Sequence, residues 1–344
     1  MGLFGRKRNV IGVDIGSGFA KIVEVDHSGD HPEVVRVAMH PLPPDAIIEG
    51  EIMEYGLVSD GLIGLFQSLG MKGADVVTAV GGHDVFIKKI EMDRMRTADV
   101  RNAVRWEAEL HVPFHIETVE LDFQILDPNG TGLQMDVLLV AAKRERIDSK
   151  IGLLQDAGVE PVVVDVDAFA LHNAFEYNYP EAQDGIVGLV NVGYETTNVS
   201  ILENGVPMLM RDIPFGLRKI CKDLQREQGL TFEQAESVIL GREVAIDLEP
   251  FVQVFADEVA VGIECARAFL LSEDDGNTVG RIYISGGGAR TPGLSQALAV
   301  RMGVETEIVN PFERVPVRPE AAVGFSLDEA APMLLLPLGL ALRA

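Results

Sequence analysis

The stretch Asp14-Ile-Gly-Ser-Gly-Phe-Ala-Lys21 decides the fold, because two apolar runs rich in β-branched residues flank its glycines. The runs Val10 to Ile15 and Phe19 to Val25 each predict a strand. The short glycine-rich segment between them predicts a tight hairpin turn. The chain therefore opens with a strand, a glycine turn and a second strand.

The residue types in this turn suit phosphate binding. The backbone N–H groups of Gly16, Ser17 and Gly18 can approach phosphate oxygens closely, because glycine has no side chain in the way. Ser17 adds a hydroxyl donor and Lys21 a positive charge for a β-phosphate. Asp14 could hold Mg²⁺ through water. Asp-x-Gly by itself is also compatible with an ordinary hairpin turn.

A second strand, turn and strand lies 177 residues further on, with Asn191 in the place of Asp14. It consists of Ile186 to Val192, the turn Asn191-Val-Gly-Tyr-Glu-Thr-Thr197, and Thr197 to Leu202. Gly193, Thr196 and Thr197 could contact the same phosphates from the other side. Taken alone, a purely structural hairpin explains this segment better, but the repeat predicts two related halves around a cleft.

A third glycine segment follows a predicted strand in Arg281-Ile-Tyr-Ile-Ser-Gly-Gly-Gly-Ala289. Backbone without side chains at Gly286, Gly287 and Gly288 lets a flat adenine ring or a ribose lie against the chain. A tight connection between a strand and a helix is the alternative. The chain thus offers three candidate nucleotide-contacting segments.

Composition excludes some classes of partner. The chain has 344 residues with 29 basic and 53 acidic side chains, a net charge of -24, which repels nucleic acid. Cys221 and Cys265 lack metal-ligand spacing and are expected to be reduced thiols. We expect no signal peptide, and the apolar stretch from 330 to 342 is too short to span a membrane. These features predict a cytoplasmic protein.

In this order, the three segments resemble the phosphate-1, phosphate-2 and adenosine motifs of the actin, Hsp70 and sugar kinase superfamily. The resemblance covers nearly the whole chain. It implies an α/β, actin-like two-domain fold that binds ATP or ADP with Mg²⁺ in a central cleft. By register, Asp167 takes the place of actin's water-orienting Gln, which makes Asp14 and Asp167 the candidate catalytic residues. An N-cap for the following helix is the alternative for Asp167.

One further segment narrows the superfamily. Val104-Arg-Trp-Glu-Ala-Glu-Leu-His-Val-Pro-Phe114 resembles a hallmark of the PilM family of type IV pilus assembly. Leu121 to Gln124, Val137 to Ala142 and Asp156 to Gly158 follow in that family's order. The resemblance implies an inserted subdomain, called 1C. Trp106, the single tryptophan, is expected to pack this subdomain.

The resemblance also predicts how the chain divides into domains. The expected parts are a flexible N-terminal tail (1–8), domain 1A (9–75, 161–185 and 325–344), subdomain 1C (76–160), domain 2A (186–215 and 280–324) and subdomain 2B (216–279). In this family, the N-terminal cytoplasmic segment of the inner-membrane protein PilN binds in a groove between 1A and 1C. The resemblance further implies a ring that contacts the pilus motor, with the membrane reached only through the partner.

Two other functions from the same superfamily stay open at this point. One is an actin-like ATPase whose hydrolysis drives a conformational cycle. The other is a filament-forming cell-division protein of the FtsA type, against which we count the expected absence of a C-terminal amphipathic helix.

The chain departs from the family on one side of the cleft. Asn191 stands where most relatives have Asp, and an amide adds no charge to Mg²⁺ coordination. Leu217 replaces a usual Gly, and Cys221 a usual Thr. Glu236 matches the residue that contacts ribose, but Ile239 replaces the Lys three positions later. We therefore expect weak or moderate ATP binding with slow or no turnover.

Overall fold

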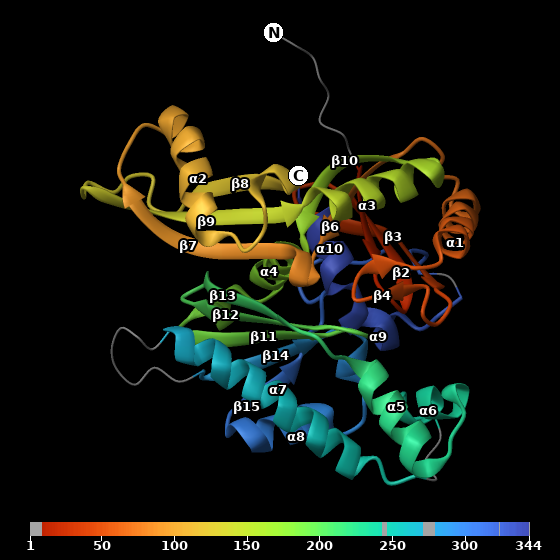
Figure 1. Ribbon diagram of the computed structural model, residues 1–344. Helices are drawn as coiled ribbons and strands as arrows, with labels where there is room; N and C mark the ends of the chain where they lie inside the picture. Colours follow the sequence, from red (N-terminus) through yellow and green to blue (C-terminus); the bar gives the residue numbers. More distant parts are fainter. Residues whose placement is uncertain (1–8, 243–245, 271–278, 323, 344) are drawn as a thin grey trace.

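The computed structural model describes residues 9–242, 246–270, 279–322 and 324–343, so the predicted tail 1–8 lies outside the described residues. Two five-stranded sheets form the centres of two halves, and a smaller three-stranded sheet stands beside the first half (Figure 1). Within the described ranges, no helix is both long and apolar enough to cross a membrane.

The first sheet has the strand order β10-β6-β1-β2-β3. β1, β2 and β3 pair antiparallel, whereas β6 runs parallel to both β1 and β10. The strands are β1 (Asn9–Ile15), β2 (Phe19–Asp26), β3 (Glu33–Pro41), β6 (Asp75–Val80) and β10 (Glu160–Val166). α1 (Tyr55–Ser68) and α3 (Arg144–Asp156) contribute to an apolar core shared with this sheet.

The second sheet repeats the pattern in the order β13-β12-β11-β14-β15, with three antiparallel strands followed by two parallel ones. Its strands are β11 (Ile186–Val192), β12 (Thr197–Glu203), β13 (Val206–Ile213), β14 (Arg281–Ser285) and β15 (Glu305–Ile308). The prediction of two related halves is thereby confirmed. The helices α5 (Leu217–Gln228), α6 (Phe232–Ile239), α7 (Glu249–Leu270) and α8 (Leu294–Met302) share one core with this sheet.

Two helices, α4 (Asp167–Asn178) and α10 (Leu335–Ala341), lie between the sheets (Figure 1). Every residue of α10 is buried, and one core joins both helices to residues of both sheets. Gly339 makes the close approach possible, because a Cβ there would collide with the carbonyl of Ala170 in α4. A shared apolar layer thus holds the two halves together.

The third sheet has β9 (Gln134–Lys143) between β7 (Val85–Asp93) and β8 (Val119–Ile125). α2 (Thr97–His111) covers it with Val100, Val104 and Ala108. The prediction that Trp106 packs this unit is wrong, because its side chain is 71% exposed. Position 106 follows 104 by about 200° around the helix, so it lies on the face opposite the buried stripe.

An ion-pair cluster holds the junction between the third sheet and the first half. Asp84 is only 3% exposed and pairs with Lys143 at 2.6 Å and with Arg146 of α3. Burial opposes ionisation of Asp84, but the hydrogen bonds from Lys143 and Arg146 hold its pKa below the usual value. β6 and α3 belong to the first half by pairing and packing, although α3 and all of β6 except Asp75 fall within the range 76–160 expected for 1C.

Two short strands contribute residues to the cavity wall, and a short helix precedes α10. They are β4 (Ile47–Ile48), β5 (Glu51–Ile52) and α9 (Leu327–Ala330).

Candidate functional site

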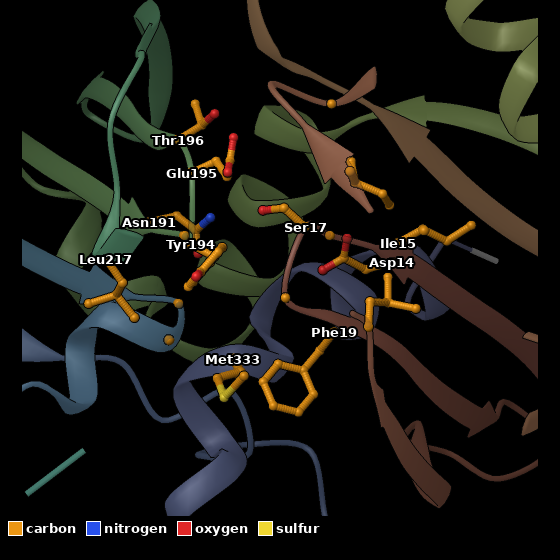
Figure 2. Close-up of a pocket in the computed structure, with 18 of the residues that line it drawn as sticks. Asp14, Ile15, Ser17, Phe19, Asn191, Tyr194, Glu195, Thr196, Leu217 and Met333 are labelled. Atoms are coloured by element: carbon orange, nitrogen blue, oxygen red, sulfur yellow. The ribbon is translucent and has the colours of Figure 1, made fainter. Parts of the chain in front are cut away.

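A cavity of about 820 Å³ lies between the two halves, at the end where both hairpin turns face each other. Figure 2 shows Asp14 and Ser17 on one side of it and Asn191 and Tyr194 on the other. The cavity brings together twelve of the predicted site residues: Asp14, Gly16, Ser17, Gly18, Lys21, Asp167, Asn191, Gly193, Thr196, Glu236, Gly286 and Gly287.

Two predicted residues do not line the cavity. Thr197 has no exposed surface, and its hydroxyl donates to the carbonyl of Phe215 at 2.9 Å. Gly288 is buried, and a Cβ there would overlap the side chain of Val192. Both predictions are wrong in the same way, because each residue supports the wall from behind instead of facing the space.

The first turn carries an ion pair. Asp14 and Lys21 are Cα partners across the β1–β2 hairpin, and the Lys21 ammonium contacts the Asp14 carboxylate. Their side chains are only 9% and 15% exposed. The Gly16 N–H donates to the carbonyl of Phe19, and Gly18 packs against Tyr194 of the opposite turn. The positive charge of Lys21 is therefore balanced by Asp14 within the turn.

The second turn carries neutral groups at the matching positions. Asn191 and Asn198 are Cα partners in β11 and β12, and the Asn191 Nδ2 donates to the Asn198 Oδ1 at 2.9 Å. Asn198 in turn donates to the carboxylate of Asp212 on β13. Burial raises the pKa of Asp212, while the hydrogen bond from Asn198 opposes the increase.

Asp212 is a cavity residue that our sequence analysis missed. Sequence patterns singled out Leu217, five residues later, but not Asp212. The signal that could have found it is the pairing of β13 with β12, which puts Asp212 level with Asn198.

Asp167 begins α4 beside the cavity, with Val166 as the N-cap and no capping hydrogen bond from a side chain. The N-cap interpretation is therefore wrong, because Asp167 is the first residue inside the helix. Burial raises the pKa of Asp167 to about 6, with Lys150 opposing the shift and the carboxylates of Asp14 and Asp212 adding to it. A carboxyl group with this pKa is mostly ionised at neutral pH and can accept a proton.

Apolar side chains and glycine backbone line much of the other end of the cavity. Gly286 has φ 85°, a conformation that favours glycine, and its N–H donates to the carbonyl of Pro332. Leu217 and Met333 also line this end, as Figure 2 shows. Cys221 lies there too, and burial, together with the charge of Glu236, raises the pKa of its thiol to about 12. Such a surface suits an uncharged aromatic ring.

Charged residues bridge the two halves at the side of the cavity. Arg218 of α5 pairs with Asp45 of the first half and with Glu195 of the second turn. The Glu49 N–H also donates to the Glu195 carboxylate at 3.0 Å. Arg218 is a second residue that the sequence did not single out, because its partners come from distant parts of the chain.

The donor set indicates what kind of metal ion would fit. Within the described ranges, no three His, Cys, Asp or Glu side chains are placed to enclose a metal ion. Asp14 and Asp167 nevertheless put carboxylates at the cavity wall. Mg²⁺ in nucleotide sites commonly keeps several waters and takes one or two carboxylates plus phosphates, which this arrangement fits.

Comparison with known proteins identifies the family. The family model for type IV pilus assembly protein PilM matches residues 12–344. A PilM-PilN type IV pilus biogenesis complex contains a chain that is 30% identical, with a TM-score of 0.84, covering 98% of this chain and 99% of that one.

More distant structures share the fold alone. Ethanolamine utilization protein EutJ from Carboxydothermus hydrogenoformans is 19% identical, with a TM-score of 0.60 and coverage of 99% and 91%. MreB 5 of Spiroplasma citri, solved with bound AMPPNP, is 12% identical, with a TM-score of 0.52 and coverage of 97% and 95%. The predicted actin-like α/β fold is confirmed by these neighbours. The chain therefore belongs to the PilM family of type IV pilus assembly proteins.

Proposed function

We propose that this chain is a scaffold of type IV pilus assembly that binds ATP or ADP with Mg²⁺ in its cleft. The observation that carries the nucleotide site is the cavity between two glycine-containing turns from equivalent positions of two sheets. The phosphates would lie between Gly16 to Gly18 and Gly193 to Thr196. The base would lie against Gly286 and Gly287.

Individual side chains have distinct roles in this proposal. Lys21 offers positive charge to a phosphate if its ion pair with Asp14 loosens. Asp14 holds Mg²⁺ through water, and the ion neutralises phosphate charge when bound. Glu236, at the apolar end, contacts the ribose.

We further propose that a PilN-like inner-membrane protein is the partner. The support is the 30% identity, over nearly the full length, to a chain of the PilM-PilN complex. The N-terminal segment of that partner would bind in a groove between domain 1A and subdomain 1C. In this arrangement the scaffold is cytoplasmic, reaches the inner membrane only through its partner, and can form a ring that contacts the pilus motor.

Two measurements test the two parts separately. Equilibrium dialysis with ATP and Mg²⁺ should show saturable binding that Asp14→Ala weakens, and no binding at millimolar nucleotide would refute the nucleotide site. A peptide from the PilN N-terminus should change the fluorescence of Trp106, whose exposed ring reports on the third sheet. Trp106→Phe is the control for the signal, and a pull-down by this variant should still succeed.

One observation favours slow ATP hydrolysis as a second candidate. Asp167 lies at the cavity with a pKa of about 6, so it could take a proton from an attacking water at neutral pH. Phosphate release measured with Asp167→Asn tests this, and turnover that is unchanged by the substitution would exclude Asp167 as the base.

A further inference from the structure

Four polar side chains cross the second sheet in one row where it meets the cavity. Asn191 is the Cα partner of Ser285 on one side and of Asn198 on the other, and Asn198 is the partner of Asp212. Hydrogen bonds join all four in sequence. The row thus forms one hydrogen-bond chain across β14, β11, β12 and β13.

The carboxylate at one end sets the direction of this chain. An ionised Asp212 accepts hydrogen bonds and donates none, so Asn198 must turn its NH₂ group toward it. The Asn198 Oδ1 then faces Asn191 and accepts from the Asn191 Nδ2 at 2.9 Å. The orientation of both amides follows from the charge on β13.

The hydrogen bond from Ser285 holds the side-chain oxygen of Asn191. Its Oδ1 accepts from the hydroxyl of Ser285 at 3.1 Å, and Ser285 has no exposed surface. The same oxygen lies against the backbone of Gly286, where a Cβ would approach it to 2.8 Å. The side-chain oxygen of Asn191 therefore already has a hydrogen-bond partner on β14.

The nitrogen of Asn191 remains on the cavity side. An NH₂ group has two hydrogens, and the bond to Asn198 uses one of them. In Figure 2 the Asn191 nitrogen points across the cavity toward the turn that carries Ser17. The second turn thus presents a hydrogen-bond donor at the position where a carboxylate would present an acceptor.

We propose that Asn191 donates a hydrogen bond directly to a nucleotide phosphate, with Asp212 as the positioning residue that fixes its amide through Asn198. The second turn then supplies no oxygen ligand to a metal ion. This inference rests on the proposed nucleotide site and specifies how one half of that site binds its ligand. It follows that Mg²⁺ acts on nucleotide affinity only through Asp14, so ADP should still bind without the ion.

The test compares the affinity for ADP in EDTA with the affinity in Mg²⁺, by equilibrium dialysis. Wild type should bind in both, with affinities within about tenfold. Asn191→Asp replaces a donor by an anion facing phosphate, so binding in EDTA should fall by about tenfold or more, with Mg²⁺ restoring most of it. Asn204→Asp, in the turn between β12 and β13 of the same sheet, is the control for added charge and should leave both affinities unchanged.

Asp212→Asn tests the positioning role without placing a new group beside the phosphate. An amide at 212 can donate as well as accept, so Asn198 and Asn191 lose their fixed orientation. The ratio of the Mg²⁺ affinity to the EDTA affinity should rise severalfold, whereas a merely structural defect would lower both affinities together. The double variant N191D/D212N moves the carboxylate to the other end of the two amides, so the direction of these hydrogen bonds reverses. It should fold more stably than N191D and keep the dependence of N191D on Mg²⁺.

The outcomes separate the two proposals. If wild type binds ADP but only with Mg²⁺, or if N191D binds in EDTA as well as wild type does, the inference about Asn191 is overturned and the nucleotide site stands. An unchanged ratio in Asp212→Asn overturns the role of Asp212. No binding by wild type in either condition overturns the nucleotide site itself, and with it this inference.

Discussion

The two hairpins that face the cavity have the same geometry and different chemistry. Asn191 and Asn198 lie 177 residues after Asp14 and Lys21, and each pair consists of direct Cα partners across its hairpin. The first pair is a buried ion pair and the second a neutral amide pair. The strand beside the first hairpin places Met39 level with Lys21, whereas β13 places Asp212 level with Asn198.

The comparison teaches that one backbone can serve two kinds of binding chemistry. In the first hairpin, opposite charges satisfy each other within the turn, so each depends on its partner in a poorly solvated place. In the second hairpin, the carboxylate belongs to Asp212 on the neighbouring strand β13. The amides of Asn198 and Asn191 connect it to the turn. Removing one member should therefore cost more in the first hairpin than in the second.

The largest effect should come from Lys21→Ala. It leaves the carboxylate of Asp14, whose side chain is 9% exposed, without its partner, and such losses cost about 3 kcal/mol or more of unfolding free energy. The matched change Asn198→Ala removes one neutral bond with Asn191 and one bond to Asp212, and should cost about 2 kcal/mol. Urea unfolding at pH 7 measures the loss of unfolding free energy in both variants. An equal loss in both, or a larger loss in Asn198→Ala, would contradict the comparison.

The next effect concerns Asp167, whose pKa the carboxylates of Asp14 on β1 and Asp212 on β13 help to raise. Its pKa is about 6 in the folded protein and 3.8 for the free group, so its ionisation opposes folding as pH rises between these values. Asp167→Asn should stabilise the protein by about 2 kcal/mol at pH 7.5 and leave stability nearly unchanged near pH 3, below both pKa values. Denaturation at both pH values tests this, and a gain that is the same at both would show that charge is not the cause.

The hairpins were predictable from the sequence because local features specify them. Apolar β-branched strands, glycine turns and the repeat after 177 residues predicted both halves, and the Trp106 segment pointed to the inserted unit. The three glycine segments likewise predicted most of the cavity wall. These features depend on residues that are close together in the sequence, or on the repeat of one strand, turn and strand pattern after 177 residues.

The missed and wrong residues depend on tertiary pairing. Asp212 reaches the cavity because β13 adds to β12, and Arg218 matters because Asp45 and Glu195 meet it from two halves. Thr197 was predicted to face the phosphates, although it lies 177 residues after the fully buried Ala20. Consistent use of the repeat would have placed its side chain inside the sheet.

A smaller effect should follow from Arg218→Ala, which removes the bridge between the second hairpin and the first half. Glu195 has a side chain that is 8% exposed, so its lost partner should cost about 1 to 2 kcal/mol. The Glu49 N–H, which donates to Glu195, should exchange faster with solvent deuterium. Arg226→Ala on the same helix is the control, because Arg226 is 69% exposed and its pairs lie on the surface.

The smallest effect should come from Thr197→Val, which tests whether the two hairpins are equivalent at the position after each turn. The hydroxyl donates to the carbonyl of Phe215, so its loss should cost about 1 kcal/mol of unfolding free energy. Nucleotide affinity should not change, since the hydroxyl points into the sheet as the side chain of Ala20 does. Ser17→Ala in the first turn should show the reverse, with little loss of stability and a severalfold loss of affinity. Thr197→Val and Ser17→Ala could instead lose nucleotide affinity to the same extent. The second turn would then have to rearrange when nucleotide binds, and the two hairpins would be equivalent only without nucleotide.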